Sequence, residues 1–246
     1  MVKSVRDRAI LIGLYLSKFD KKGTEALGFS SFTEAFNILG LSIGAKPASL
    51  KNYRDEFDPL FPNKRMGWHK RQMRNYCRNF YDEYSDLDFK TFNNLLKSFV
   101  LQDFDVMEIM EKSQNKDKSE TVAKRLATGK AAEEYFKRNY QTVNDFNYFE
   151  LKDTTNLACG FDFKLSNNSD FYCVEVKGLS TASGSVSLTE KEFNVAKTYT
   201  NKFCLFVVLN FIEKPYHDYF FDPLNSRLKF KKIERQVTQV NYSTAI

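Results

Sequence analysis

Histidine, tryptophan and proline are scarce in this sequence, with two, one and five copies among 246 residues. His69 and His217 have no metal-ligand partners at useful spacing, and the four cysteines form no Cys-x-x-Cys pair. A zinc site built on these residue types is therefore not expected. The cysteines also lie among apolar residues, which is typical of reduced thiols, and we expect a reducing cytoplasm.

Long apolar runs are also absent. The longest strictly apolar segment, Phe203–Leu209, is far shorter than the ~20 residues of a membrane helix, so no membrane partner is expected. An apolar stretch at residues 9–16 follows three basic residues, but Asp7 lies among them and no small-residue cleavage site follows. We interpret this stretch as a buried first helix rather than a signal peptide.

Aromatic and basic residues are abundant. The chain has 24 Phe, 13 Tyr and 42% hydrophobic residues, enough for a substantial core, which excludes global disorder. Lys and Arg total 37 against 31 acidic residues, a net charge of +6. This excess permits a polyanionic partner without requiring one.

The pattern of apolar residues changes along the chain. Residues 1–112 repeat apolar side chains at helical spacing, and residues 32–41 and 48–57 have the proportions of a helix-turn-helix. Residues 112–120 contain no apolar side chain and suggest a boundary. Beyond it, helical segments alternate with β-prone ones. The sequence predicts a two-domain α+β protein: a helical domain at 1–112 and an α/β domain with a central mixed sheet at 113–246.

Charged residues interrupt two of the predicted strands. In residues 171–178, a period of two places Glu175 and Lys177 side by side on the face opposite Val174 and Val176. Asp162 interrupts the preceding strand, and residues 166–170 between the strands have turn composition. A hairpin would bring Asp162 close to Glu175.

Two carboxylates beside a lysine suit metal-assisted phosphodiester cleavage. Carboxylate oxygens bind Mg²⁺, and an ammonium can stabilise charge that develops on a phosphate. The spacing alone is weak evidence, because Glu150 and Lys152 show it too. Only Glu175 and Lys177 lie in an apolar strand that ends at a glycine and follows an acidic strand.

Several segments, in order, resemble the PD-(D/E)xK nuclease superfamily, and within it the NO VEIN C-terminal domain family, which is related to Mrr-like restriction nucleases. The similar pieces are Gly129-Lys-Ala-Ala-Glu133, Gly160-Phe-Asp162-Phe, Val174-Glu175-Val-Lys177-Gly, Leu188-Thr189-Glu-Lys-Glu192 and Phe203–Leu209. Phe161 stands where the family usually has Tyr, and Gly178 where Ser or Thr is frequent.

This resemblance implies roles for named residues. Asp162 and Glu175 would be Mg²⁺ ligands, Lys177 the catalytic lysine, and Glu133 a helix carboxylate that reaches the site. The alternative for Glu133 is a solvated helix residue, and for the other three a buried ion cluster without turnover. Glu192 is either a supporting group or, as we favour from the sequence, an ordinary helix charge.

Residues 59–81 contain six basic residues and no acid, interleaved with Trp68, His69 and Tyr76. Such a mixture attracts a phosphate backbone, although a solvated basic face would look the same. Trp68 suits a core anchor or a base contact equally. The candidate DNA-binding residues, including those on the second helix of the helix-turn-helix-like pair, are Lys51, Asn52, Arg54, Lys64, Arg65, Lys70, Arg71, Arg74 and Arg78. Basic residues at 227–235 suggest a second phosphate-facing patch or an edge strand protected by charge.

The sequence therefore predicts a Mg²⁺-dependent restriction-type endonuclease of double-stranded DNA. A single site cuts one strand, so a double-strand break implies a homodimer or two successive nicks. The alternatives are a non-catalytic DNA-binding protein that retains the nuclease fold and a protein-interaction component of a defence system.

Overall fold

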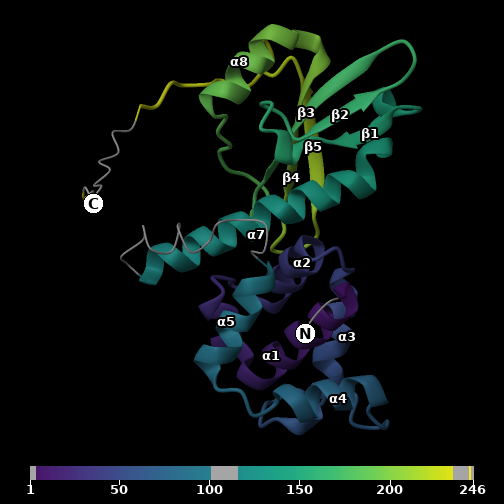
Figure 1. The fold of residues 1–246 in the computed structure, drawn as a ribbon, viewed down its shortest axis with the longest axis vertical. Coiled ribbons are helices and arrows are strands. Elements are labelled where there is room, and N and C mark those ends of the chain that lie inside the picture. The colour runs from purple at the N-terminus through teal and green to yellow at the C-terminus, as the bar shows by residue number, and fades with distance from the viewer. Residues whose placement is uncertain (1–3, 101–115, 235–243, 245–246) are drawn as a thin grey trace.

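Helices fill the first half of the chain and a mixed β-sheet the second (Figure 1). This computed structural model describes residues 4–100, 116–234 and 244. The helices are α1 (Val5–Ala26), α2 (Phe32–Ser42), α3 (Pro47–Phe57), α4 (Asn75–Tyr84), α5 (Phe89–Val100), α7 (Lys116–Asn139) and α8 (Glu190–Tyr199). The strands are β1 (Glu150–Asp153), β2 (Phe163–Ser166), β3 (Phe171–Gly178), β4 (Phe203–Leu209) and β5 (Tyr216–Phe221). The predicted α+β class and mixed sheet are confirmed.

The N-terminal helices begin where local chemistry predicts. Ser4 caps α1 and Ser31 caps α2, each accepting a backbone N–H of the first turn, and Pro47 lies in the first turn of α3. The α1–α3 contact is close because Gly13 has no side chain: a Cβ there would lie 2.5 Å from the Cβ of Tyr53. Helix α4, which begins within the basic segment, was not predicted. Among the described helices, none is long and apolar enough to cross a membrane.

The sheet has the order β1-β2-β3-β4-β5. Only β3 and β4 are parallel, and α8 lies in the connection between them; the other neighbouring pairs are antiparallel. Strand β4 is buried along its whole length, as predicted from its continuous apolar run. Strand β5 was not predicted.

Two helices cover opposite faces of the sheet. Val174 and Val176 of β3 point toward α7 and share a core with Phe136 of that helix, whereas Cys173 packs with Ala196 of α8. Figure 1 shows α7 between the sheet and the N-terminal helices, in agreement with its contacts to α2, β3 and β4. The alternation of β3 therefore decides that Glu175 and Lys177 lie on the α8 face.

Contacts between α2 and the second half join the two parts of the chain. The Asn37 side chain donates hydrogen bonds to the carbonyls of Phe211, at 2.8 Å, and Glu213, at 2.9 Å. Lys124 of α7 forms an ion pair with the buried Glu34 at 2.7 Å. Buried apolar side chains of both parts form one contiguous cluster. The boundary that the sequence places at residues 112/113 lies outside the described residues.

Candidate active site

The β2–β3 hairpin brings Asp162 to the middle of β3. Phe163 pairs with Val174, and Asp162 immediately precedes β2. The backbone N–H of Asp162 donates to the Val174 carbonyl at 3.0 Å, and that of Val176 donates to Asp162 Oδ2 at 2.8 Å. Asp162 therefore lies beside Glu175, as the predicted hairpin requires.

Glu175 and Lys177 meet on the α8 face of β3. Glu175 is only 3% exposed, and the Lys177 ammonium donates to its Oε1 at 2.5 Å. Strand alternation sends Val176, between them, to the opposite core. The side-by-side arrangement expected from the two-residue period is present.

Glu192 of α8 also contacts the lysine. The Lys177 ammonium donates to Glu192 Oε2 at 2.9 Å. The same oxygen accepts the backbone N–H of Thr189 at 2.9 Å, which completes a capping box at the start of α8. The sequence interpretation of Glu192 as an ordinary helix charge missed this contact. The Thr-x-x-Glu spacing signals a cap, but nothing local signals a distant lysine.

Glu133 of α7 is partly buried and lies within electrostatic reach of Asp162. Burial and the negative charge of Asp162 raise its pKa to about 7, while Lys137 and Lys130 oppose that shift. The raised pKa argues against a fully solvated Glu133, and its role in the site stays a prediction. Gly178, at the end of β3, permits the close approach of α7: a Cβ there would lie 2.9 Å from the Thr128 carbonyl oxygen.

Burial disfavours negative charge on both carboxyl groups of the cluster. Burial raises the pKa of Asp162 to about 6, against the opposing effects of the Val176 N–H and Lys177. Burial and the Asp162 charge raise the pKa of Glu175 to about 8. Burial alone would lower the pKa of Lys177, but Glu175 and Glu192 outweigh it and the pKa rises, so the lysine stays cationic. An additional cation would relieve the repulsion between the carboxylates.

The donor set is suited to a hard cation that keeps much of its water. Within the described ranges, no three His, Cys, Asp or Glu side chains converge as a complete metal centre. Asp162 and Glu175 each use one oxygen in a hydrogen bond, and the other oxygen of each accepts none from the described residues. Mg²⁺ commonly binds through one or two carboxylates plus water, so these two ligands are compatible with it.

Several of the candidate DNA-binding arginines form ion pairs within the helical half, and the buried Arg54 does not face solvent as the sequence predicted. Arg54 is 8% exposed and pairs with Asp55 and Asp58. Arg65 pairs with Asp58 and Asp20. These acidic residues precede the acid-free segment in sequence. The segment therefore lacks acids of its own, but acids from outside it neutralise part of its positive charge.

Glu56 neutralises a second pair of candidates. This buried carboxylate contacts Arg74, whose backbone N–H and guanidinium both donate to it, and Arg71 at 3.5 Å. The pKa of Arg74 is raised chiefly by this hydrogen bond. Arg71 also lies over the half-buried ring of Trp68, 3.8 Å from its centroid. Trp68 is thus half-buried against this arginine and is not among the residues of the apolar core cluster that the structure describes.

The other candidates are accessible. Four basic side chains and one amide are exposed and form no ion pair or hydrogen bond with the described residues: Lys51, Asn52, Lys64, Lys70 and Arg78. They lie on α3, on α4 and on the segment between these helices. The exposed candidates without an ion pair are thus fewer than the nine residues expected from sequence.

The basic segment after β5 runs beside the carboxylate cluster. Leu228 and Phe230 pack with Leu205 and Val207, which pair with Glu175 and Lys177 across the sheet. Alternating residues at 227, 229 and 231 are basic and exposed. No strand forms within 222–234, so the edge-strand interpretation is wrong for these residues. Residue 235 lies outside the described ranges.

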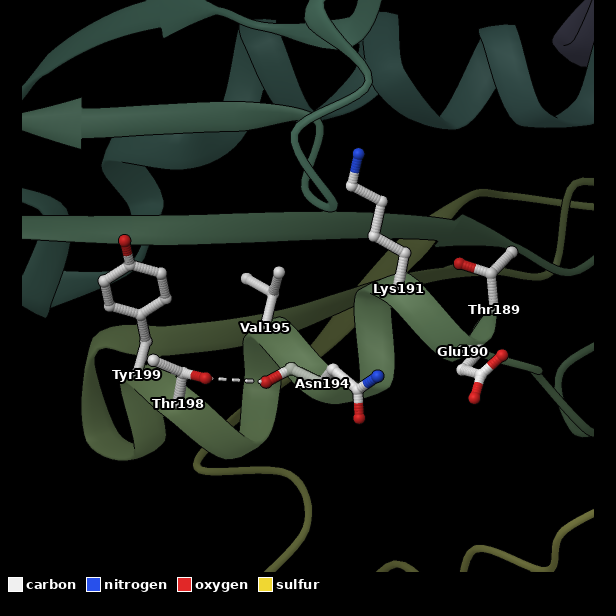
Figure 2. Close-up of a pocket in the computed structure, with 7 residues that line it drawn as sticks. All are labelled: Thr189, Glu190, Lys191, Asn194, Val195, Thr198 and Tyr199. Carbon is white, nitrogen blue, oxygen red and sulfur yellow. Dashed lines mark hydrogen bonds between the residues drawn. The ribbon is translucent and has the colours of Figure 1, made fainter.

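A shallow hollow of about 750 Å³ lies along α8, on the side where Lys191 and Val195 approach Gly160 (Figure 2). It is lined by Thr189, Glu190, Lys191, Asn194, Val195, Thr198 and Tyr199. Glu192 does not line it, because it shares the inward face of the helix with the buried Ala196, four residues on. The hollow is therefore separate from the carboxylate cluster.

The segment that carries the carboxylate cluster is similar to a known protein family. Residues 130–221 match the family model described as Protein NO VEIN, C-terminal. The matched segment begins in α7 and ends at β5, so it contains the whole sheet and α8. No curated protein and no solved structure matches the chain. Residues 130–221 are thus similar to a nuclease-like family, and this segment contains the carboxylate cluster.

Proposed function

We propose that this protein is a Mg²⁺-dependent endonuclease of the PD-(D/E)xK type that hydrolyses double-stranded DNA, as restriction enzymes do. The observation that carries the proposal is the convergence of Asp162, Glu175 and Lys177 at one point of the sheet, with Lys177 2.5 Å from Glu175. The match to a nuclease-like family over the same segment supports it.

Each residue of the cluster has a distinct role in this proposal. Asp162 and Glu175 hold Mg²⁺ through their available oxygens. Bound Mg²⁺ would supply Lewis-acid polarisation of the phosphate and acidify a water molecule. Lys177 donates hydrogen bonds to the phosphate oxygens and so stabilises the negative charge that develops on them. Glu133, whose pKa is about 7, can exchange a proton near neutral pH at the same place.

The DNA duplex contacts the exposed basic residues of the helical half and the basic segment at 227–231. Lys51 and Asn52 lie on the exposed side of α3, where a helix-turn-helix protein carries base-reading side chains. A homodimer, or two nicks by one site, would produce a double-strand break. All four cysteines are free thiols, which suits a protein acting on DNA in a reducing cytoplasm.

A non-catalytic DNA-binding protein is the second candidate. The observation that favours it is the ammonium of Lys177 against Glu175, which already neutralises one of the two ligands without a metal. On this alternative the cluster is a buried ion network that holds α8 to the sheet.

Cleavage assays with matched variants decide between the two. Unmodified and methylated duplex DNA would be incubated with the protein in Mg²⁺ or in EDTA, and the product ends mapped. We expect Asp162→Asn and Lys177→Met to reduce the cleavage rate at least about a thousandfold while DNA affinity stays within about threefold, since these groups act as a unit.

Asp170→Asn is the control for the hairpin itself. Asp170 forms an ion pair with Lys202 at the opposite end of β3 from Lys177, so its loss should leave cleavage unchanged. Wild-type protein that binds DNA but cuts neither substrate in Mg²⁺ would favour the second candidate. Cleavage by Asp162→Asn at the wild-type rate would show that this residue is not a ligand.

A further inference from the structure

Lys177 is shared between two carboxylates, one on its own strand and one on α8. Its ammonium lies 2.5 Å from Glu175 Oε1 and 2.9 Å from Glu192 Oε2. We propose that Glu192 is a positioning residue that holds Lys177 so that Glu175 can give up the lysine and bind a divalent cation. This inference rests on the proposed function.

The position of Glu192 is set by the start of α8. Its Oε2 accepts the backbone N–H of Thr189, while its own N–H donates to Thr189 Oγ1 at 3.3 Å. The side chain is 16% exposed, and Ala196, on the same helix face, is fully buried against the sheet. The carboxylate is therefore held on a rigid element rather than on a mobile loop.

A second acceptor is needed because the lysine and a metal ion compete for Glu175. Ammonium and divalent cation repel each other, so a cation at Glu175 would displace Lys177 toward another anion. Among the described residues, Glu192 is the other carboxylate that Lys177 contacts. Without that negative charge the lysine would pair with Glu175 alone and oppose metal binding.

The capping and positioning roles of Glu192 can be separated by substitution. Gln can replace Glu in a capping box, so Glu192→Gln keeps the cap and removes the charge facing Lys177. Thr189→Ala does the reverse, because it removes the hydroxyl of the cap and leaves the carboxylate in place. The first variant tests positioning, and the second controls for helix stability.

The test is a double-mutant cycle on metal binding by the full-length, DNA-free protein. Mn²⁺, which takes the same oxygen ligands as Mg²⁺, would be titrated by calorimetry into wild type, Glu192→Gln, Lys177→Met, the double variant and Thr189→Ala. We expect Glu192→Gln to weaken Mn²⁺ binding about tenfold when Lys177 is present and less than about threefold in the Lys177→Met background. Thr189→Ala should lower the melting temperature without changing Mn²⁺ affinity.

Equal weakening in both backgrounds would overturn the proposal, since Glu192 would then act only as a distant charge. Unchanged affinity in Glu192→Gln, or no Mn²⁺ uptake by the wild type, would overturn it as well. The titration needs no cleavage, so it is independent of whether DNA is cut. A protein with the expected metal cycle that leaves DNA intact would contradict the nuclease proposal alone.

Discussion

Replacing the carboxylate of Glu175 by an amide should stabilise the metal-free protein. A pKa of about 8 in place of 4.5 means that full ionisation of Glu175 costs the folded chain about 5 kcal/mol relative to the unfolded chain. At pH 7 the folded protein binds a proton instead, and the cost that remains is about 3 kcal/mol. Glu175→Gln removes this cost but also weakens the hydrogen bond that Lys177 donates to this side chain, so we expect a net gain of about 1–2 kcal/mol.

The pH dependence has a defined sign. Because the pKa of Glu175 is higher in the folded than in the unfolded state, the folded protein binds the proton more tightly. The contribution of Glu175 to stability is therefore greatest below about pH 4.5 and is lost as the pH rises toward about 8. Mg²⁺ at pH 8 should reverse the loss in wild type and not in Glu175→Gln, because only the carboxylate binds the ion.

Urea denaturation in EDTA and in Mg²⁺, at several pH values, measures these effects. Glu134→Gln is the matched control, since Glu134 is in a solvent-accessible i,i+4 pair with Arg138 and its loss should change stability by less than about 0.5 kcal/mol. If Glu175→Gln were less stable than wild type in EDTA at pH 8, the argument that this site is strained by excess negative charge would be refuted.

The remaining predictions concern the DNA surface, the α7–β3 contact and the contact between the halves. Changing Lys64, Lys70 and Arg78 together to Gln should reduce the slope of log K against log salt by up to about three units without lowering the melting temperature; an unchanged slope would place the DNA elsewhere. Gly178→Val should lower stability by about 1–3 kcal/mol in thermal melts, because its side chain would meet the α7 backbone, and wild-type stability would contradict that contact. Burial would raise the pKa of Glu34, but its lysine and serine partners lower it, so its stabilising effect is present above about pH 4.5 and lost as the pH falls through its lowered pKa; Glu34→Gln should flatten that acid limb in urea melts.

Local periodicity was sufficient to predict that Glu175 and Lys177 lie side by side at the centre of the candidate site. Glu175 and Lys177 are two residues apart on an apolar strand, and the pleat of any strand places such residues on one face. The turn composition between β2 and β3 was enough to predict the hairpin that brings Asp162 beside them. The continuous apolar run of β4 predicted its burial on both faces. These features depend on neighbours in sequence, and the sequence by itself determined them.

Other features were decided only when distant segments met. Strand β5 has a mixed pattern of exposure without a continuous apolar run, and it forms because the edge of β4 offers unpaired backbone groups. Glu192 reaches Lys177 only because α8 folds back across the sheet. Arg54 and Arg74 looked available for DNA, yet Asp58 and Glu56 pair with them, and Arg54 is buried. The sequence shows which charged side chains are present. Only the tertiary structure decides which of them are neutralised by ion pairs, because ion pairing depends on distance in space rather than on separation along the chain.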